Sequence, residues 1–325
     1  MKIILFDAIY LLTLIGLVAS WYLFRPLRHH AKPATFNCLK ATDGKFKSIR
    51  LKPKHIFAVG LSYAQHIDET AHEFDPIATA TVFLKEKRSL IPGGGSTEIP
   101  HSEELMAEAA HLDPALPGLL RQKFADIPPL MDYEVELGFI LLENISDANL
   151  ADPDYKPKLG FFIANDLSAR SLQILGEGMP NRLDYWGLSK SLADFLPTTT
   201  QVWVPYETVA DAIPCVTLET RVNGEIRQSA KTDNMIYTPR QMLVAARQTY
   251  PNLALKKGDL VIMGTPGGIA LSTPRFKARL AALLRFDRFT KLRFILKGDR
   301  RQFLKAGDTV SVSGEWLGEV TTRME

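Results

Sequence analysis

The stretch that decides the fold is Asp132-Tyr133-Glu134-Val135-Glu136-Leu137-Gly138-Phe139-Ile140-Leu141-Leu142, in which acidic residues open a long apolar run. Such a run is typical of a buried strand, and residues two positions apart in a strand point to the same face. Glu134 and Glu136 should therefore project together. Two buried carboxylates repel each other and are costly to desolvate unless a cation neutralises them.

A third carboxylate follows a second apolar run, Leu159-Gly160-Phe161-Phe162-Ile163-Ala164-Asn165-Asp166. If the two runs lie on neighbouring strands, Asp166 completes a metal site with Glu134 and Glu136. No cysteine or histidine is near them in the sequence, and an all-oxygen site selects a hard ion such as Mg²⁺, Mn²⁺ or Ca²⁺. The alternative, from spacing alone, is a solvated strand face with alternating glutamates.

Both segments belong to a longer series of motifs, whose order and spacing are also informative. The series is Ala58–Glu69, Phe83-Leu84-Lys85, Asp132–Leu137, Ala164–Arg170, Lys190-Ser191, Val222-Asn223-Gly224 and Gly264-Thr265-Pro266. Over roughly residues 50–325 it resembles the fumarylacetoacetate hydrolase superfamily, in its acylpyruvase and 2-hydroxyhepta-2,4-diene-1,7-dioate isomerase-like branch.

The resemblance implies a mainly β fold with α elements, a mixed β-sandwich roll that usually forms a homodimer. It also implies a divalent ion, Mg²⁺ or Mn²⁺, held by Glu134, Glu136 and Asp166, which binds the vicinal oxygens of a 2-oxo acid. Members of the family cleave carbon–carbon bonds, decarboxylate, hydrate or isomerise, so the family does not fix the reaction.

Three matching positions are candidate catalytic residues. Lys190 matches the family's site lysine, and a cation there would stabilise an enolate, often by about 3 kcal/mol in a dry site. His66 and Glu69 are three residues apart on one predicted helical turn and share a face. The carboxylate can then orient the imidazole as a general base for water. Asp68 also neighbours His66, and only the resemblance selects Glu69; without the family, Lys190 and His66 would be interpreted as surface residues.

Four positions are candidate substrate-binding residues. Thr265 lies in a Gly/Pro-rich turn after an apolar strand, where glycines let the backbone approach a ligand and the hydroxyl can hold a carboxylate. Ordinary loop structure is the alternative interpretation of that turn. Tyr63, Arg170 and Gln173 match family positions near the site.

Residues 3–24 are almost wholly apolar, and Ala8–Phe24 is an uncharged run of 17 residues. This length is near the lower limit for a membrane-spanning helix. Basic residues that follow directly predict a cytoplasmic C-terminal side: Arg25, Arg28 and Lys32. A cleaved signal peptide is the alternative, with Val18-Ala19-Ser20 as a possible cleavage site and an exported enzyme as its product.

The expected organisation is a transmembrane anchor over 1–25, a basic linker and lead-in strand over 26–49, and a catalytic domain over 50–325. The expected location is the inner membrane, with a single span and the catalytic domain facing the cytoplasm. Cys38 and Cys215 are far apart in the sequence and indicate no disulfide framework, which is compatible with a reducing compartment.

Two insertions interrupt the family pattern, at about 101–129 and 273–303. The first predicts a short helix and a loop that narrow the pocket or pack at a subunit interface. The second lies in a basic stretch, 275–305, with 11 Lys/Arg and 2 Asp. Its part 275–288 has the pattern of a basic amphipathic helix, which we expect on an anionic membrane leaflet. The alternative is a solvated helix packed on the domain; no recognised nucleic-acid-binding module accompanies it.

The expected function is that of a divalent-metal-dependent hydrolase that cleaves a carbon–carbon bond in a small 2-oxo acid resembling an acylpyruvate or fumarylacetoacetate. Within the family, the alternatives are a 2-oxo acid decarboxylase and an isomerase or tautomerase, neither of which needs an activated water. From another class, the alternative is a catalytically silent ligand sensor or membrane scaffold.

Overall fold

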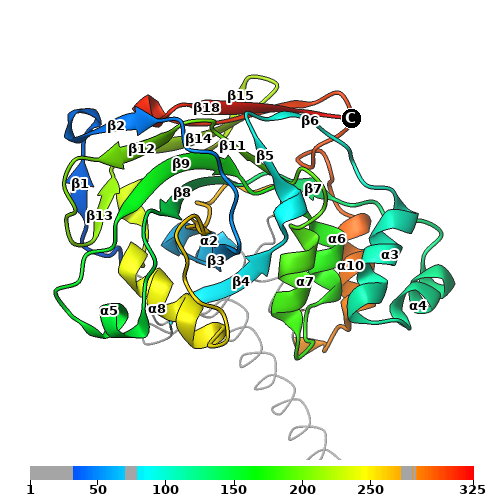
Figure 1. Cartoon of the computed structure of the whole chain (residues 1–325). Helices are drawn as coiled ribbons and strands as arrows, with labels where there is room; N and C mark the ends of the chain where they lie inside the picture. Colours follow the sequence, from blue (N-terminus) through cyan, green and yellow to red (C-terminus); the bar gives the residue numbers. More distant parts are fainter. Residues whose placement is uncertain (1–31, 70–78, 272–279, 281–282) are drawn as a thin grey trace, which may run out of the picture.

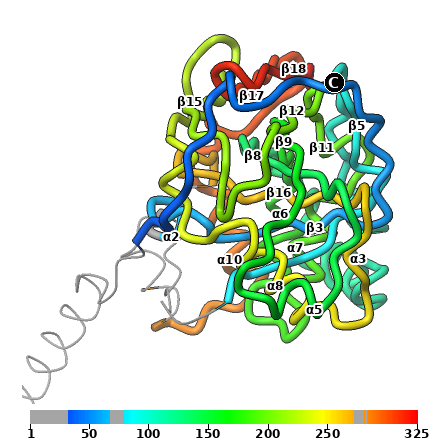
Figure 2. The backbone as a smooth tube through the Cα atoms, turned by 60° about the vertical axis from the view of Figure 1, so that its left-hand side comes forward, coloured from blue at the N-terminus to red at the C-terminus, as the bar shows by residue number. Residues whose placement is uncertain are grey.

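The computed structural model describes residues 32–69, 79–271, 280 and 283–325. Two β-sheets lie one above the other in Figure 1, with helices gathered at both sides of the larger sheet. In the view turned by 60°, strands β17 (Thr309–Gly314) and β18 (Glu319–Met324) lie above β8 (Val135–Leu141) and β9 (Leu159–Asn165), so the sheets form separate layers (Figure 2). The larger sheet has nine strands and the smaller has five.

The larger sheet has β8 and β9 near its centre. They pair antiparallel with Glu136 opposite Ala164, while β16 pairs antiparallel with β8 and parallel with β3. The apolar runs expected to be neighbouring strands are therefore neighbours. In path order the strands are β2 (Gly44–Lys47), β12 (Val202–Pro205), β9 (Leu159–Asn165), β8 (Val135–Leu141), β16 (Leu260–Ile262), β3 (Ile56–Gly60) and β4 (Thr81–Lys85), with β11 (Leu196–Thr198) and β5 (Leu90–Pro92) branching off.

The smaller sheet is antiparallel except for its last pair, in which β18 and β6 run parallel. Its strands in order are β15 (Glu225–Lys231), β14 (Thr217–Val222), β17 (Thr309–Gly314), β18 (Glu319–Met324) and β6 (Gly95–Thr97). Two short ladders complete the described strands: β1 (Asn37–Leu39) with β13 (Ala212–Pro214), and β7 (Met131–Asp132) with β10 (Ser168–Ala169).

The two faces of β8 meet different layers, because successive side chains of a strand alternate. Val135, Leu137 and Phe139 are buried between the sheets, in one core with apolar residues of β14, β17 and β18. On the opposite face, Ile140 packs in a second cluster with Trp186 of helix α7 (Arg182–Ser189). Glu136 is four positions before Ile140 on the same strand, so the two side chains point to the same face. The Glu136 carboxylate therefore lies on the helix-covered face and not in the core between the sheets.

Helices cover two sides of the larger sheet (Figure 1). One group holds α3 (Ser102–Leu112), α4 (Leu116–Lys123), α6 (Arg170–Leu175), α7 and α10 (Arg288–Leu296); the other holds α5 (Asp147–Ala151) and α8 (Pro239–Thr249). The short helix α2 (Ala64–Glu69) follows β3.

The first insertion forms two helices, α3 and α4, where the sequence predicted one helix and a loop. Pro117 sits in the first turn of α4, where proline is tolerated because its missing N–H would have no helical partner. Pro117 therefore lies at the start of a helix, in the part of the insertion for which the sequence predicted a loop. Apolar side chains of both helices are buried in one cluster with Tyr185 and Leu188 of α7.

The prediction of a transmembrane helix, and of a membrane location with the catalytic domain facing the cytoplasm, is wrong by the structure. Within the described ranges no helix is long and apolar enough to cross a membrane. The longest of them, α3 and α8, have 11 residues each, against about 20 for a spanning helix. The segment that prompted the prediction, 3–24, lies outside the described residues. The prediction of a span rested on the apolar composition of this segment.

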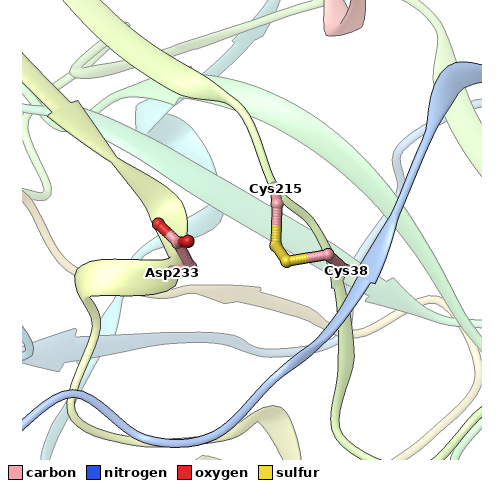
Figure 3. Close-up of side chains that lie close together, drawn as sticks. All are labelled: Cys38, Cys215 and Asp233. Atoms are coloured by element: carbon pink, nitrogen blue, oxygen red, sulfur yellow. A yellow bond between two sulfur atoms is a disulfide. The ribbon is translucent and has the colours of Figure 1, made fainter.

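Cys38 and Cys215 form a disulfide, so the expectation of no disulfide framework is also wrong. Figure 3 shows the bond joining the lead-in strand to the segment after β13, with Asp233 nearby. The two cysteines are 177 residues apart in the chain. The parallel pairing of β1 with β13 brings them together, with Cys38 opposite Ile213, and sequence spacing gives no sign of it.

The second insertion contributes α10, while half of the predicted amphipathic helix over 275–288, residues 275–279, 281 and 282, lies outside the described residues. Phe289 and Leu292 of α10 are buried in the cluster that also holds Leu172 and Ile174 of α6. Part of the insertion therefore packs onto the domain, whereas a membrane contact of 275–288 stays a prediction.

Candidate active site

Glu134, Glu136 and Asp166 meet where β8 begins and β9 ends. Glu134 directly precedes β8, and its backbone N–H donates to Asn165 Oδ1 at 3.1 Å. The backbone N–H of Asp166 donates to the Glu134 carbonyl at 2.8 Å. One oxygen from each of the three carboxylates lies within 4.8 Å of the others, and all three residues are buried. The antiparallel register thus assembles the predicted set.

Two buried lysines contact these carboxylates from other elements. Lys190, at the end of α7, places its Nζ 2.5 Å from Glu134 Oε2 and 2.6 Å from Asp166 Oδ2. It also donates to Ser168 Oγ at 2.8 Å. Lys85, at the end of β4, places its Nζ 2.6 Å from Asp166 Oδ1 and donates to the Lys190 carbonyl.

Arg170 joins the carboxylate set to its surroundings. Its Nε donates to Asp132 Oδ2 at 2.8 Å, and one terminal nitrogen donates to Gln173 Oε1 at 2.6 Å. The other terminal nitrogen donates to Glu134. Asp132 also accepts the backbone N–H groups of residues 270 and 271, at 2.8 and 3.1 Å. Arg170 is therefore held on several sides, and one of its partners is Gln173, another candidate substrate-binding residue.

The pKa values of Glu134 and Glu136 are shifted in opposite directions. Burial opposes ionisation of Glu134, but Lys190 and Arg170 outweigh it and lower its pKa to about 2. Burial raises the pKa of Glu136 well above its usual value of 4.5, and the charges of Asp166 and Glu134 raise it further. Burial lowers the pKa of Lys190, but Asp166 and Glu134 outweigh burial and raise it, which keeps its ammonium charged.

The donor set fits a hard divalent ion. Glu136 accepts the Gly264 N–H at 2.6 Å, but burial and the nearby charges of Asp166 and Glu134 oppose its ionisation. A further cation between the three carboxylates would relieve this repulsion, and carboxylate oxygens are the ligands that Mg²⁺ and Mn²⁺ prefer.

Thr265 follows β16 through Gly264, whose φ of 89° favours glycine. The Thr265 hydroxyl oxygen accepts a hydrogen bond from Gln228 Nε2 at 2.9 Å. Gln228 lies on β15, and its Oε1 accepts the Val135 N–H at 3.0 Å and the Thr220 hydroxyl at 2.7 Å. These contacts fix the orientation of the Gln228 amide, so the Thr265 proton can be donated to a ligand.

His66 and Tyr63 take different positions. His66 is 8% exposed and lines the cavity beside the carboxylates. Tyr63 lies in the core between the sheets, where burial, then the charges of Glu136 and Asp233, raises its pKa. It is not among the described residues that line the cavity. The side chain of Glu69 lies outside the described part of the structure, so its pairing with His66 stays a prediction.

The cavity has a volume of about 210 Å³ and two contrasting walls. We call the first the charged wall: Glu134, Glu136, Asp166, Arg170 and Lys190. We call the second the apolar wall: Ile174, Trp186, Leu271, Phe286, Phe294 and Ile295. His66, Gln173 and Thr265 also line the cavity, as do Glu177 and Lys291. Apart from Tyr63 and Glu69, the predicted site residues therefore share one cavity.

Sequence reasoning missed two buried polar residues of the site, Lys85 and Gln228. Lys85 is two residues after Phe83 on β4, so strand alternation places it on the same buried face, and a lysine on such a face is a usable signal. Gln228 lies in a polar strand of the other sheet, where only the packing of the two sheets reveals its contact with Thr265.

Comparisons with known proteins show which family the chain belongs to. The model of the fumarylacetoacetate (FAA) hydrolase C-terminal family matches residues 55–325. An uncharacterised protein of Staphylococcus epidermidis is 28% identical over 289 residues, which cover 86% of this chain and 72% of that protein. One of Staphylococcus haemolyticus is 28% identical over 278 residues, covering 83% and 68%.

Solved structures show the same fold at low identity. A fumarylpyruvate hydrolase from Pseudomonas aeruginosa, in complex with Mn²⁺ and pyruvate, has a TM-score of 0.55 at 18% identity, covering 92% of this chain and 99% of that one. A probable 2-hydroxyhepta-2,4-diene-1,7-dioate isomerase from Mycobacterium abscessus has a TM-score of 0.52 at 19% identity, covering 84% and 76%. With the family model matching most of its length, the chain belongs to the fumarylacetoacetate hydrolase family.

Proposed function

We propose that this protein is a divalent-metal-dependent hydrolase that cleaves a carbon–carbon bond in a small acylpyruvate-like 2-oxo acid. The observation that carries the proposal is the group of three buried carboxylates within 4.8 Å, set in a cavity that also holds His66, Lys190 and Thr265. Family membership supports the coarser class of hydrolases and isomerases. The likeness to a fumarylpyruvate hydrolase supports the choice by fold alone.

In this proposal Glu134, Glu136 and Asp166 hold Mg²⁺ or Mn²⁺. Such an ion neutralises the carboxylates and acts as a Lewis acid toward the vicinal oxygens of a 2-oxo acid. The Thr265 hydroxyl, oriented by Gln228, donates to the carboxylate of the substrate. The homodimer implied by the family resemblance is part of the proposal, and native mass spectrometry tests it.

His66 is the proposed general base. It takes a proton from water as the oxygen adds to the distal carbonyl carbon of the acylpyruvate. The bond from that carbon to the methylene then breaks, its electron pair passes to the methylene carbon as the enolate of pyruvate, and that carbon takes up a proton. The products are pyruvate and a carboxylic acid, with one water consumed. Lys190 supplies a fixed positive charge near the developing enolate.

The test follows acetylpyruvate with the full-length protein in Mg²⁺, in Mn²⁺ and in a chelator, and identifies the products. Metal-dependent formation of pyruvate and acetate in equal amounts is the expected result. Release of CO₂ without acetate would favour a decarboxylase, and rearrangement without cleavage would favour an isomerase. Metal binding without turnover across a panel of acylpyruvates would favour a ligand sensor.

The variant His66→Ala tests the general base. Hydrolysis should fall by about 10²–10⁴-fold, whereas a metal-driven decarboxylation would persist because it needs no activated water. His101→Ala is the matched control, since His101 is exposed at the start of α3 and makes no side-chain capping bond. Equal activity in the two variants would remove His66 from the mechanism.

A further inference from the structure

Half of the apolar wall is built by the second insertion, and the rest comes from α6, α7 and Leu271. Phe294 and Ile295 come from α10, Phe286 lies just before it, and Ile174 comes from α6. Phe294 is 52% exposed. An aromatic ring that solvent reaches at a cavity gains from contact with an apolar ligand, because both surfaces then leave water.

Helix α10 is joined to its neighbours by hydrogen bonds at its N-terminal end. Asp287 caps its first turn by accepting the Thr290 N–H at 2.7 Å. Arg288 donates to Asp113 at 3.0 Å and to the Leu175 carbonyl at 3.2 Å, which ties α10 to the first insertion and to α6.

Each described lysine and arginine that lines the cavity is paired with a carboxylate. Lys291, one turn before Phe294 and Ile295 on α10, lies 3.8 Å from the Glu177 carboxylate, and both residues line the cavity. The other lysine and the arginine that line it, Lys190 and Arg170, contact the carboxylates of the charged wall. Among the residues that the structure describes, the cavity therefore offers no uncompensated lysine or arginine to a second carboxylate at its apolar wall.

From this arrangement we infer that the protein selects acylpyruvates whose acyl group is apolar and uncharged, and discriminates against 2-oxo dicarboxylates. The inference rests on the proposed function and narrows its substrate class. With the 2-oxo acid at the charged wall, the acyl group lies against the apolar wall. A distal carboxylate there would lose its water against apolar side chains, and the described part of the wall offers it no unpaired cation, which is unfavourable.

The experiment compares two substrates of the same shape with the full-length protein and Mg²⁺. One is fumarylpyruvate; the other is (E)-4-methylpent-2-enoylpyruvate, in which an isopropyl group replaces the distal carboxylate. The value of kcat/KM should be at least about tenfold higher for the isopropyl compound, a typical discrimination for an apolar pocket. Calorimetric Kd values of the two compounds provide a second readout that needs no turnover.

Two variants locate the cause of the selectivity. Phe294→Ala should lower the isopropyl-to-carboxylate ratio of kcat/KM about tenfold, because it removes apolar contact area. Glu177→Gln should raise kcat/KM for fumarylpyruvate several-fold, because Lys291 loses its anionic neighbour, and should give no such gain with the isopropyl compound. Phe46→Ala, on the far edge of the larger sheet, is the control for a half-exposed phenylalanine.

The outcomes separate the inference from the proposed function. Cleavage of both compounds with fumarylpyruvate equal or preferred would overturn the inference and leave the hydrolase intact. Cleavage of neither would count against the hydrolase, and the Kd values would then decide the selectivity: tighter binding of the isopropyl compound supports it, and equal or weaker binding overturns it.

Discussion

The charged and apolar walls of the cavity face the same space but arise from different parts of the fold. In the charged wall, the carboxylates stand on paired strands, and each is fixed by backbone hydrogen bonds or buried cations. In the apolar wall, Phe286, Phe294 and Ile295 come from an insertion outside the family motifs, whereas Ile174, Trp186 and Leu271 come from α6, α7 and the segment after β16. The difference suggests that the chemistry is fixed by strand register, whereas selectivity can change with the sequence of one inserted helix.

The largest expected effect comes from the charged wall, through Glu136→Gln. Loss of one ligand charge should abolish Mn²⁺ binding and lower kcat/KM for every acylpyruvate on the order of 10³-fold or more. Electron paramagnetic resonance of free Mn²⁺ and steady-state kinetics measure the two effects. Glu104→Gln is the exposed control. If Glu136→Gln still bound Mn²⁺, the charged wall would not have the metal-binding role that distinguishes it from the apolar wall.

A region outside both walls should affect stability without affecting selectivity. Replacing Cys38 and Cys215 together by serine removes the disulfide, which should lower the free energy of unfolding by about 2–4 kcal/mol. Urea denaturation measures this loss. The ratio of kcat/KM between the two matched substrates should stay as in the parent protein, and a changed ratio would mean that selectivity is not confined to the apolar wall.

When metal is absent, Glu136 in the charged wall should lower the free energy of unfolding. A carboxyl group whose pKa is raised by folding destabilises the folded state as the pH rises above its unfolded value, here 4.5. Metal-free Glu136→Gln should therefore be more stable than the parent at pH 7.

Denaturation of both metal-free proteins from pH 4 to 8 checks this expectation, with the difference growing as the pH rises. The opposite trend would mean that Glu136 is already compensated without metal. Glu134 should behave in the other direction, because its pKa of about 2 means that its stabilising contribution is lost as the pH falls below about 4.5.

The smallest expected effect lies in the apolar wall. Ile295→Val removes one methylene, equivalent to about 0.8 kcal/mol of burial or roughly a fourfold change. We expect that fall in kcat/KM for the isopropyl compound and a smaller one for acetylpyruvate, measured side by side by pyruvate release. Equal falls for both would mean that the acyl group does not reach Ile295.

Much of the charged wall could be predicted from the sequence, because strand alternation is a local rule. It placed Glu134 and Glu136 on one face, and the second apolar run placed Asp166 beside them. Lys190 was found only through the family resemblance. Gln228 escaped because its contact with Thr265 depends on the packing of two sheets, which no local pattern records.

The apolar wall could not be predicted in the same way. Hydrophobic spacing shows that an inserted helix has an apolar face, but not what that face packs against. The sequence therefore did not predict that Phe286, Phe294 and Ile295 of the second insertion line the cavity. The disulfide escaped for a related reason, since 177 residues separate its cysteines and a strand pairing joins them.

The most direct test of the central claim is the hydrolysis of acetylpyruvate in H₂¹⁸O with Mg²⁺, followed by mass spectrometry of the products. The account predicts one ¹⁸O atom in the carboxylate of acetate and none in the carboxylate of pyruvate, with no label incorporated when a chelator is present. Metal-dependent consumption of acetylpyruvate that gives CO₂ or a rearranged acid, without labelled acetate, would contradict it.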